Sequence, residues 1–398
     1  MSVVSQFLEP PRLRTVEEQS EDRRATWLEL FFDLVFVVAV AELGLNLTTD
    51  PTFHGLLVYA GLFVPVWWAW AGFTFYANRF DTDDLVYRLL TLAAMFAVAA
   101  LAANVPGVPT GASTGFAISY VGVRAVLILL YARALRYVEP ARPLARLYLS
   151  FFGAAIVVWL ISLAVDPPGR YGVWAVALAL ELTAPIFGWR RIPRAPIDVR
   201  HLPERYGLLT IIVLGESVLA VVLGVANVSW SVASALAAAA GFLAAAALWW
   251  IYFEYLDASM VRRGIFAGLV FTYAHFFVVA GIAALGVGVK LEILSAGGNG
   301  RYDDTTWIFC AGLAAAMLGL AAIQLATPPA VFDADVWLRL ATAAGALVLL
   351  AASFSLPVLV VVWLLSGLLV VQVGVELARH STHVPGKLDE AAVESPHG

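Results

Sequence analysis

Apolar stretches long enough to cross a lipid bilayer recur along almost the whole chain, separated by short polar or Pro- and Gly-containing breaks. A transmembrane helix needs roughly 20 mostly apolar residues to cross roughly 30 Å of hydrocarbon. Hydrophobic residues make up 61% of the chain and charged residues 13%, whereas soluble domains are about 45–50% apolar and about 25% charged. A water-soluble core cannot hide this excess, but lipid can. The sequence therefore predicts an all-α, polytopic integral membrane protein.

The breaks between these stretches predict about twelve transmembrane helices. The predicted spans cover residues 27–47, 54–77, 85–103, 114–135, 144–165, 170–189, 206–227, 231–255, 264–288, 305–326, 337–354 and 357–378. The last two form one continuous apolar run, which we divide at residues 354–357 because the run is twice one bilayer crossing and Pro357 favours a turn. Pro65 and Pro185 fall inside spans, and we expect them to kink these helices rather than end them.

Lysine and arginine are distributed unevenly between the two sides of this topology. With the N-terminus in the cytoplasm, twenty of the 24 face the cytoplasm, whereas Arg170, Lys290 and Arg301 face outward and Arg124 stays inside a span. The positive-inside rule therefore predicts that both termini are cytoplasmic, and it supports an even number of spans. We expect residues 1–26 to form a solvated cytoplasmic arm and residues 379–398 to form a disordered tail.

The spans divide into two related halves, residues 27–200 and residues 201–378, with six spans each. Glu29 falls over Glu204 at an offset of 175 residues. Three pairs of residues stand in similar stretches of sequence at corresponding spans of the two halves: Glu29 and Glu204, Trp67 and Trp249, and Glu181 and Glu376. Because each half has an even number of spans, both halves point the same way, and the expected symmetry is a pseudo-two-fold axis along the membrane normal.

Signatures of several enzyme and carrier classes are missing from the sequence. It contains no GxxxxGK[ST], no HExxH and no CxxC motif. His275 is the only histidine deep in a span, which argues against paired-histidine haem ligation. The net charge of −5 comes without a basic patch, which argues against a nucleic-acid partner, and the single Cys310 cannot form an intrachain disulfide. We expect no enzymatic activity, no cofactor and no metal site.

Several ionisable residues lie inside predicted spans, and we single out four of them because a charge there costs at least about 2.5–3.5 kcal/mol on insertion scales. Arg124, Glu216 and His275 fall near the midplane, and Asp33 lies about 9 Å from the cytoplasmic end of its span. We interpret them as a shared polar interior that serves as a substrate or proton pathway, with Arg124 as the charge partner of Glu216. The alternative for that pair is an ion pair that only fixes helix packing. The alternative for His275 is a hydrogen-bonded contact between helices.

Two carboxylates share one face of the first span, because Glu29 lies four residues before Asp33. Carboxylates placed this way can share a proton or hold a cation. The alternative for Glu29 is a solvated residue at the membrane interface.

The loop after the second span carries three acids on a side of the membrane that is otherwise basic. It reads "RFDTDD" and contains Arg79, Asp81, Asp83 and Asp84. We interpret it as a cytoplasmic latch in which acids pair with loop arginines. A Mg²⁺ site and a solvated acidic loop are the alternatives.

Three long segments carry a resemblance to a known family. They read "WLELFFDLVFVVAVAEL" at 27–43, "WWAWAGFTFYANRFDTDD" at 67–84 and "ERYGLLTIIVLGESVLAVV" at 204–222. They closely resemble the bacterial low temperature requirement A family, and the resemblance covers essentially the whole chain. It implies a multi-pass protein of the bacterial cytoplasmic (plasma) membrane that is associated with growth in the cold. The residues that occupy the characteristic positions of the family are Glu29, Asp33, Arg79, Asp81, Asp83, Asp84, Glu204, Arg205, Gly215, Glu216 and Ser217.

Two functions from different classes fit these observations. The first is a secondary transporter or permease for an unidentified small solute, with protons as the candidate coupling ion. The second is a non-transporting membrane sensor or scaffold that supports growth at low temperature, with a partner bound at the arginine-rich loops 133–146 and 190–205. Membrane lipid surrounds the protein in both cases. An enzyme acting on lipid has no recognisable catalytic constellation in the sequence.

Overall fold

The computed structural model describes residues 9–13, 25–198, 201–255, 264–302, 304–326 and 333–381. Twelve long α-helices make up most of this part of the chain, together with one pair of two-residue strands and short 3₁₀ turns. The helices are α2 (Trp27–Thr49), α3 (Phe53–Arg79), α4 (Leu85–Asn104), α5 (Thr114–Tyr137), α6 (Arg142–Ser162), α7 (Gly169–Gly188), α8 (His201–Ala226), α9 (Val232–Tyr255), α10 (Ile265–Ala296), α11 (Trp307–Leu325), α12 (Ala334–Ala352) and α13 (Val358–Ser381). The strands are β1 (Arg12–Leu13) and β2 (Phe80–Asp81), and the 3₁₀ turns are η1 (Val105–Gly107), η2 (Glu139–Ala141), η3 (Ile192–Arg194) and η5 (Gly300–Tyr302).

Eleven of the described helices, α3 to α13, are long and apolar enough to cross a membrane by length and composition. The twelfth, α2, has 23 residues and carries three carboxylates, those of Glu29, Asp33 and Glu42. The predicted all-α membrane fold is therefore confirmed. The last apolar run is divided where the sequence predicts, because α12 ends at Ala352 and α13 begins at Val358. Helices α3 and α7 continue through Pro65 and Pro185.

A capping box sets the start of α2. The side chain of Thr26 accepts a hydrogen bond from the backbone N–H of Glu29 at 3.2 Å, and the Glu29 carboxylate accepts one from the backbone N–H of Thr26 at 2.8 Å. Two N–H groups that lack partners within the helix are satisfied in this way. The same contacts hold the Glu29 carboxylate at the first turn, directly above Asp33 on the same helix face.

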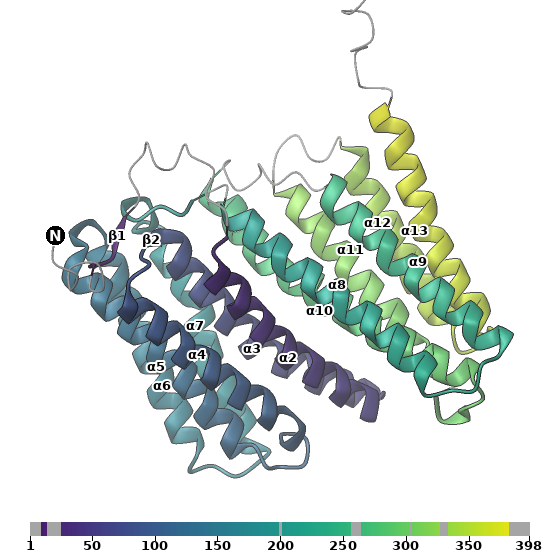
Figure 1. Ribbon diagram of the computed structural model, residues 1–398, viewed down its shortest axis with the longest axis horizontal. Helices are drawn as coiled ribbons and strands as arrows, with labels where there is room; N and C mark the ends of the chain where they lie inside the picture. The colour runs from purple at the N-terminus through teal and green to yellow at the C-terminus, as the bar shows by residue number, and fades with distance from the viewer. Residues whose placement is uncertain are drawn as a thin grey trace, which may run out of the picture.

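The helices of the two halves share a series of contacts, although α9 also packs against α10 and α13 and α3 packs instead against α5. In each half the first helix packs against the second and the third, and the third to sixth helices pack against one another in chain order. Helices α2 to α7 lie on the left in Figure 1 and α8 to α13 on the right, with the first helices of the two halves, α2 and α8, in contact at the junction. This pattern is what a repeat requires, although the repeat itself stays a prediction.

Helix α10 is the most enclosed helix of the second half, and glycines allow it to approach α11 closely. A Cβ atom on Gly312 would lie 2.6 Å from the backbone nitrogen of Leu285, and one on Gly281 would lie 2.7 Å from the backbone of α11. Small residues of this kind let membrane helices pack backbone against backbone. The resulting α10–α11 pair holds α10 against α2 and α8 at the junction.

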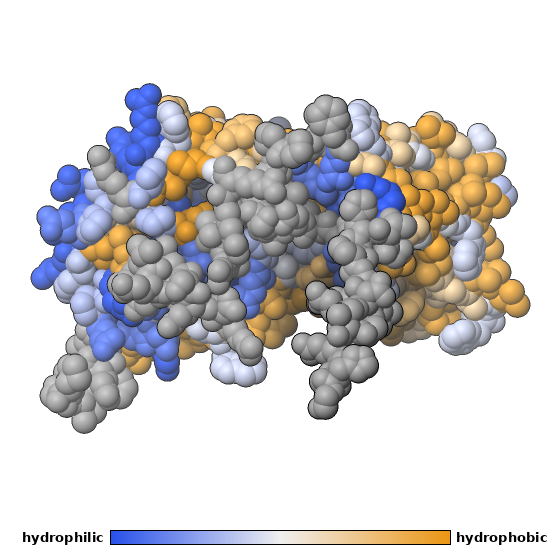
Figure 2. All heavy atoms as spheres, turned by 90° about the horizontal axis from the view of Figure 1, so that it is seen from above, coloured by the Kyte–Doolittle hydropathy of each residue, from blue (hydrophilic) through white to orange (hydrophobic). Residues whose placement is uncertain are grey.

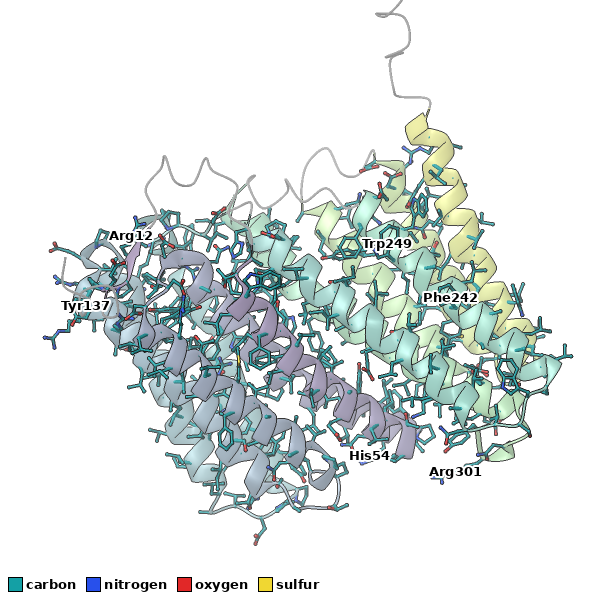
Figure 3. All side chains as sticks on the ribbon, in the orientation of Figure 1. Arg12, His54, Tyr137, Phe242, Trp249 and Arg301 are labelled. Carbon is teal, nitrogen blue, oxygen red and sulfur yellow. The ribbon has the colours of Figure 1, made fainter. Side chains whose placement is uncertain are left out.

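The start of α2 and the end of α13 lie at the same end of the bundle, which we call the terminal end (Figure 1). Arg12 and Tyr137 lie at this end, whereas His54 and Arg301 lie at the opposite end (Figure 3). Figure 2 views the terminal end and shows hydrophilic residues gathered mainly over the first half. An even number of crossings requires this arrangement. That the terminal end faces the cytoplasm stays a prediction.

Part of the predicted N-terminal arm packs onto the first half. β1 pairs antiparallel with β2, with Arg12 opposite Asp81 and Leu13 opposite Phe80. The remainder of the arm, residues 1–8 and 14–24, lies outside the described residues. At the other end of the chain α13 continues to Ser381, past the predicted start of the tail at residue 379, and residues 382–398 lie outside the described residues.

Candidate functional site

Arg205 of α8 lies between the two carboxylates of α2. Its guanidinium is 2.5 Å from a carboxylate oxygen of Asp33 and 3.2 Å from one of Glu29. The side chains of all three residues are almost completely buried. Glu29 is therefore not the solvated interfacial residue of the alternative interpretation. The α2 face that the sequence predicts to carry both acids is turned toward the second half of the protein.

His201 lies one helical turn before Arg205 and contacts two glutamates. Its Nε2 is 3.4 Å from Glu29, and its Nδ1 is 3.2 Å from Glu204. Glu29 and Glu204 are the two residues that the predicted repeat aligns, and one buried imidazole joins them.

We call Glu29, Asp33, His201, Glu204 and Arg205 the junction cluster. With a neutral imidazole it holds three carboxylates and one guanidinium, which is an excess of two negative charges. One oxygen of Asp33 and the Nε of Arg205 are buried and make no hydrogen bond within the described residues. The cluster therefore gathers charged and titratable side chains of both halves at their contact.

Trp70 of α3 connects the junction cluster to His275 through aromatic contacts. Its indole N–H donates to Asp33 at 2.8 Å, and its ring packs edge-on against Tyr206 at 4.8 Å between centroids. Tyr206 in turn lies 4.6 Å from the His275 ring, which is held between Tyr252 and the backbone of its own helix. Because His275 Nδ1 faces the carbonyl oxygen of residue 271, it donates there and Nε2 accepts from Tyr252. The geometry of His275 is that of a hydrogen-bonded contact between helices.

Arg124 does not pair with Glu216, contrary to the sequence-based interpretation. Its guanidinium lies 2.5 Å from the carboxylate of Glu181, and both side chains are completely buried. Tyr120 bridges them, since it donates to Glu181 at 2.7 Å and accepts from Arg124 at 2.6 Å. These residues come from α5 and α7, so the ion pair is internal to the first half. Glu181 is the nearer partner because α7 packs in the same half as α5, whereas Glu216 lies on α8.

The Gly215–Glu216–Ser217 segment divides between two sides of α8. Gly215 is exposed and has no atom near the position of its missing Cβ. Ser217 is buried and donates to the carbonyl oxygen of Ile282 in α10 at 3.1 Å. Glu216 is half-buried and faces a cavity that it shares with Lys290. The structure therefore separates Glu216 from both Arg124 and the junction cluster.

The three acids of the predicted latch each pair with a different arginine. Asp81 lies 2.7 Å from Arg12, Asp83 lies 2.7 Å from Arg88, and Asp84 lies 2.7 Å from Arg133. The acids thus connect β2 and the start of α4 to the N-terminal strand and to α5. Within the described residues no group of three or more potential metal ligands is present.

Arg79 has a different role from the three acids of the latch. Its Nε donates to the backbone carbonyl of Ala195 at 3.2 Å, and its guanidinium lies over the rings of Phe75 and Tyr148. Next to it, Asn78 donates to the carbonyl of Asp198 at 3.1 Å and accepts from its N–H at 2.6 Å. Both residues therefore hold the segment that leads from the first half into α8.

Replacing Asp84 by alanine is expected to lower the free energy of unfolding by about 2–3 kcal/mol. Asp84 caps α4 by accepting from the N–H of Tyr87 at 3.1 Å, and the same side chain pairs with the largely buried Arg133. Asp83→Ala is the matched control, since its ion pair with Arg88 is exposed and should contribute nothing measurable. Unfolding of both variants in detergent checks the difference, and equal stability of the two variants contradicts it.

Sequence reasoning did not single out His201, Trp70 or Glu181 as site residues. His201 lies three and four residues before Glu204 and Arg205, so helical spacing alone would have placed it on their face. Glu181 lies inside a predicted span of the same half as Arg124, and this placement is the signal that could have found it. Trp70 carried no comparable signal, because a tryptophan inside a span is more often packed in the core than hydrogen-bonded to a carboxylate.

Comparison with known proteins gives two matches. The family model described as "Bacterial low temperature requirement A protein (LtrA)" matches residues 24–374 of this chain. An uncharacterized protein of Rhizobium meliloti (strain 1021) is 29% identical over 310 residues, which is 72% of this chain and 74% of the relative. The family match spans both halves, and it therefore includes the junction cluster, the Arg124–Glu181 pair and the latch.

Proposed function

This chain belongs to the bacterial low temperature requirement A family, and from its buried charges we propose that it is a proton-coupled secondary transporter of a small solute. We place it in the bacterial plasma membrane with the terminal end toward the cytoplasm, as its lysine and arginine distribution predicts. The proposal is of a transporter rather than an enzyme or a scaffold.

One observation carries the proposal, namely the contacts of His201 with Glu29 and of Arg205 with Glu29 and Asp33 across the contact between the two halves. Transporters built from two repeats alternate their access by moving one half against the other around a fixed site. Protonation of a carboxylate in the junction cluster weakens its attraction to Arg205. A proton therefore changes the contact that such a movement has to break.

The energetics favour a functional role for the cluster over a purely structural one. Burying an ion pair costs desolvation free energy that the attraction between the charges often only offsets, so apolar residues would pack the same contact equally well. Ionisable residues in membrane segments accordingly mark proton and solute pathways more often than structural contacts. The contact of α2 with α8 brings five ionisable residues together, four of which are almost completely buried.

Two of the cavities between the halves lie toward opposite ends of the bundle. One of about 270 Å³ is at the terminal end, and its lining includes Arg79 and Tyr148 of the first half and Thr272 of α10. The other, of about 230 Å³, lies toward the opposite end between α2, α8 and α10. Each cavity is lined by residues of both halves, so a rocking movement of the halves would enlarge one cavity and close the other.

Flux measurements in proteoliposomes test this function. Vesicles that contain the full chain and a pH-sensitive dye are exposed to classes of small solutes under an imposed pH gradient. For the transported class we expect proton movement above that of empty vesicles. Asp33→Asn should reduce the flux driven by the pH gradient to roughly a tenth or less, the scale of a lost proton-transfer group. Solute exchange without a gradient should persist, because exchange needs no net movement of protons.

Asp83→Asn is the matched control, since it removes a carboxylate on the same side of the protein from an exposed ion pair. It should transport like the wild type. Gradient-driven flux that is unchanged in Asp33→Asn would exclude the junction cluster as the coupling site. A wild-type protein that moves no protons with any solute class, and that instead retains a protein partner through purification, would favour the scaffold function.

A further inference from the structure

The cavity between α2, α8 and α10 combines charged and apolar lining in the half of the bundle away from the terminal end. Glu42 of α2, Glu216 of α8 and Lys290 of α10 line it. These residues lie six to ten positions before the ends of their helices, which is roughly 9–15 Å below that end of the bundle. The cavity volume is about 230 Å³. The charges therefore lie on helices and not in a loop. Lys290, which the sequence places beyond a span ending at residue 288, lies within α10 because that helix continues to Ala296.

The three charged groups share the cavity without pairing. Glu216 is close enough to Lys290 to interact with it electrostatically, but no salt bridge within 4 Å and no hydrogen bond joins them. Within the described part of the chain, Glu42 also makes neither kind of contact. Membrane proteins normally pair such residues with one another or with backbone groups. Here the space between the charges is open, and a ligand can supply the partner for them.

Close packing fixes the backbones of the three helices that carry the charged groups of the cavity. Gly286 of α10 lies directly against Ser217 of α8, where a Cβ would come within 2.7 Å of the serine hydroxyl oxygen. Gly44 of α2 meets Val287 of α10 in the same way, at 3.2 Å. These close contacts fix the three helices relative to one another. The backbone positions that carry Glu42, Glu216 and Lys290 are therefore held by helix packing.

The charge of the cavity selects a class of ligand. Two carboxylates and one ammonium leave one excess negative charge, which one monovalent cation neutralises. An anion would add to the excess, and a zwitterion would leave it unchanged. The rest of the lining is mostly apolar, including Val40, Leu219 and Val287. Small metal cations prefer about six or more oxygen ligands, whereas an alkylammonium needs few polar contacts and also gains from apolar walls.

We infer that this cavity binds a small organic monocation, with an ammonium group placed between Glu42 and Glu216 and an apolar body against the walls of α2, α8 and α10. The inference rests on the proposed transport function and names its class of solute. Lys290 limits the cavity to one positive charge, because its own ammonium already balances one of the two carboxylates.

Equilibrium binding to the full chain in lipid nanodiscs tests this inference without requiring transport. The probes are three compounds of equal carbon count, namely n-butylammonium as the cation, 4-aminobutyrate as the zwitterion and butyrate as the anion. Calorimetry should detect binding of n-butylammonium alone. Glu216→Gln and Glu42→Gln should each weaken it about tenfold or more, the effect of losing a hydrogen bond to a charged group. Lys290→Met should strengthen it, since the excess negative charge then rises.

Two further variants separate loss of the site from loss of the fold. Ala220→Phe keeps all three charges and fills the cavity, so it should abolish binding. Glu139→Gln removes an exposed carboxylate on a 3₁₀ turn and should bind like the wild type. Equal binding of n-butylammonium by the wild type, Glu216→Gln and Ala220→Phe overturns the site, as does stronger binding of the zwitterion or the anion. Binding as expected without any proton-linked flux leaves the site standing and overturns the transport function.

Discussion

Arg205→Met is expected to lower the free energy of unfolding by about 3–5 kcal/mol, because it leaves the carboxylates of Glu29 and Asp33 buried without their shared cation. Methionine replaces the apolar stem of arginine, so most of this effect comes from the lost cation. Thermal unfolding in detergent or nanodiscs measures it. Transport driven by a pH gradient should be lost in the same variant.

A charge-neutral version of the junction cluster separates the two effects of Arg205. The triple variant Glu29→Gln, Asp33→Asn and Arg205→Met removes the unpaired charges and should recover most of the lost stability, since an apolar or neutral replacement of a buried ion pair is often close to neutral. It should not recover gradient-driven transport. Arg88→Met is the control, because its ion pair with Asp83 is exposed. An Arg205→Met protein that unfolds like the wild type would show that the cluster bears no buried charge.

Arg124→Met is also expected to destabilise the protein by about 3–5 kcal/mol, through the unpaired carboxylate that it leaves on Glu181. Neither side chain has any solvent exposure, and Tyr120 is hydrogen-bonded to both. The double variant Arg124→Met and Glu181→Leu should recover most of this loss, apart from the unsatisfied hydroxyl of Tyr120. Unfolding of the single and double variants under the same conditions measures the coupling between the two residues.

The expected effect on transport distinguishes the Arg124–Glu181 pair from the junction cluster. Because the Arg124–Glu181 pair lies within one half, the double variant should keep the pH dependence of transport once its stability is restored. Loss of gradient-driven flux in a stable double variant would instead place the pair in the pathway. The second half offers a comparison, since Arg339 of α12 interacts electrostatically with Glu376 of α13 and both are completely buried. Glu181 and Glu376 are the residues that the predicted repeat aligns.

Most of the architecture could be predicted from the sequence because hydrophobicity is a local property. Each apolar stretch must bury its backbone hydrogen bonds within itself in lipid, so its length determines a helix. The division near Pro357 follows from the same reasoning, and α12 and α13 meet there. The shared face of Glu29 and Asp33 was likewise a consequence of helical spacing, and in the structure both contact one guanidinium.

The candidate site could be predicted only in part. The sequence identified buried acids and a buried arginine, and it placed Asp33 and His275 in the interior, where Trp70 and Tyr206 connect them. It assigned Arg124 to Glu216 because both fall near one depth in the bilayer. Depth along a span does not specify which neighbouring helix a side chain faces. The actual partner, Glu181, lies on a helix of the same half as Arg124.

The sequence by itself therefore determined the helices, their order and the residues that lipid cannot accept as free charges. Only the tertiary structure decided which of those charges meet: Arg205 with Asp33 and Glu29, Arg124 with Glu181, and Glu216 with an open cavity beside Lys290. The physical reason is that insertion into lipid depends on composition along one segment. Which charged side chains pair depends on how helices distant in sequence are rotated and which helices they contact. Close packing at a few small residues sets this rotation and these contacts.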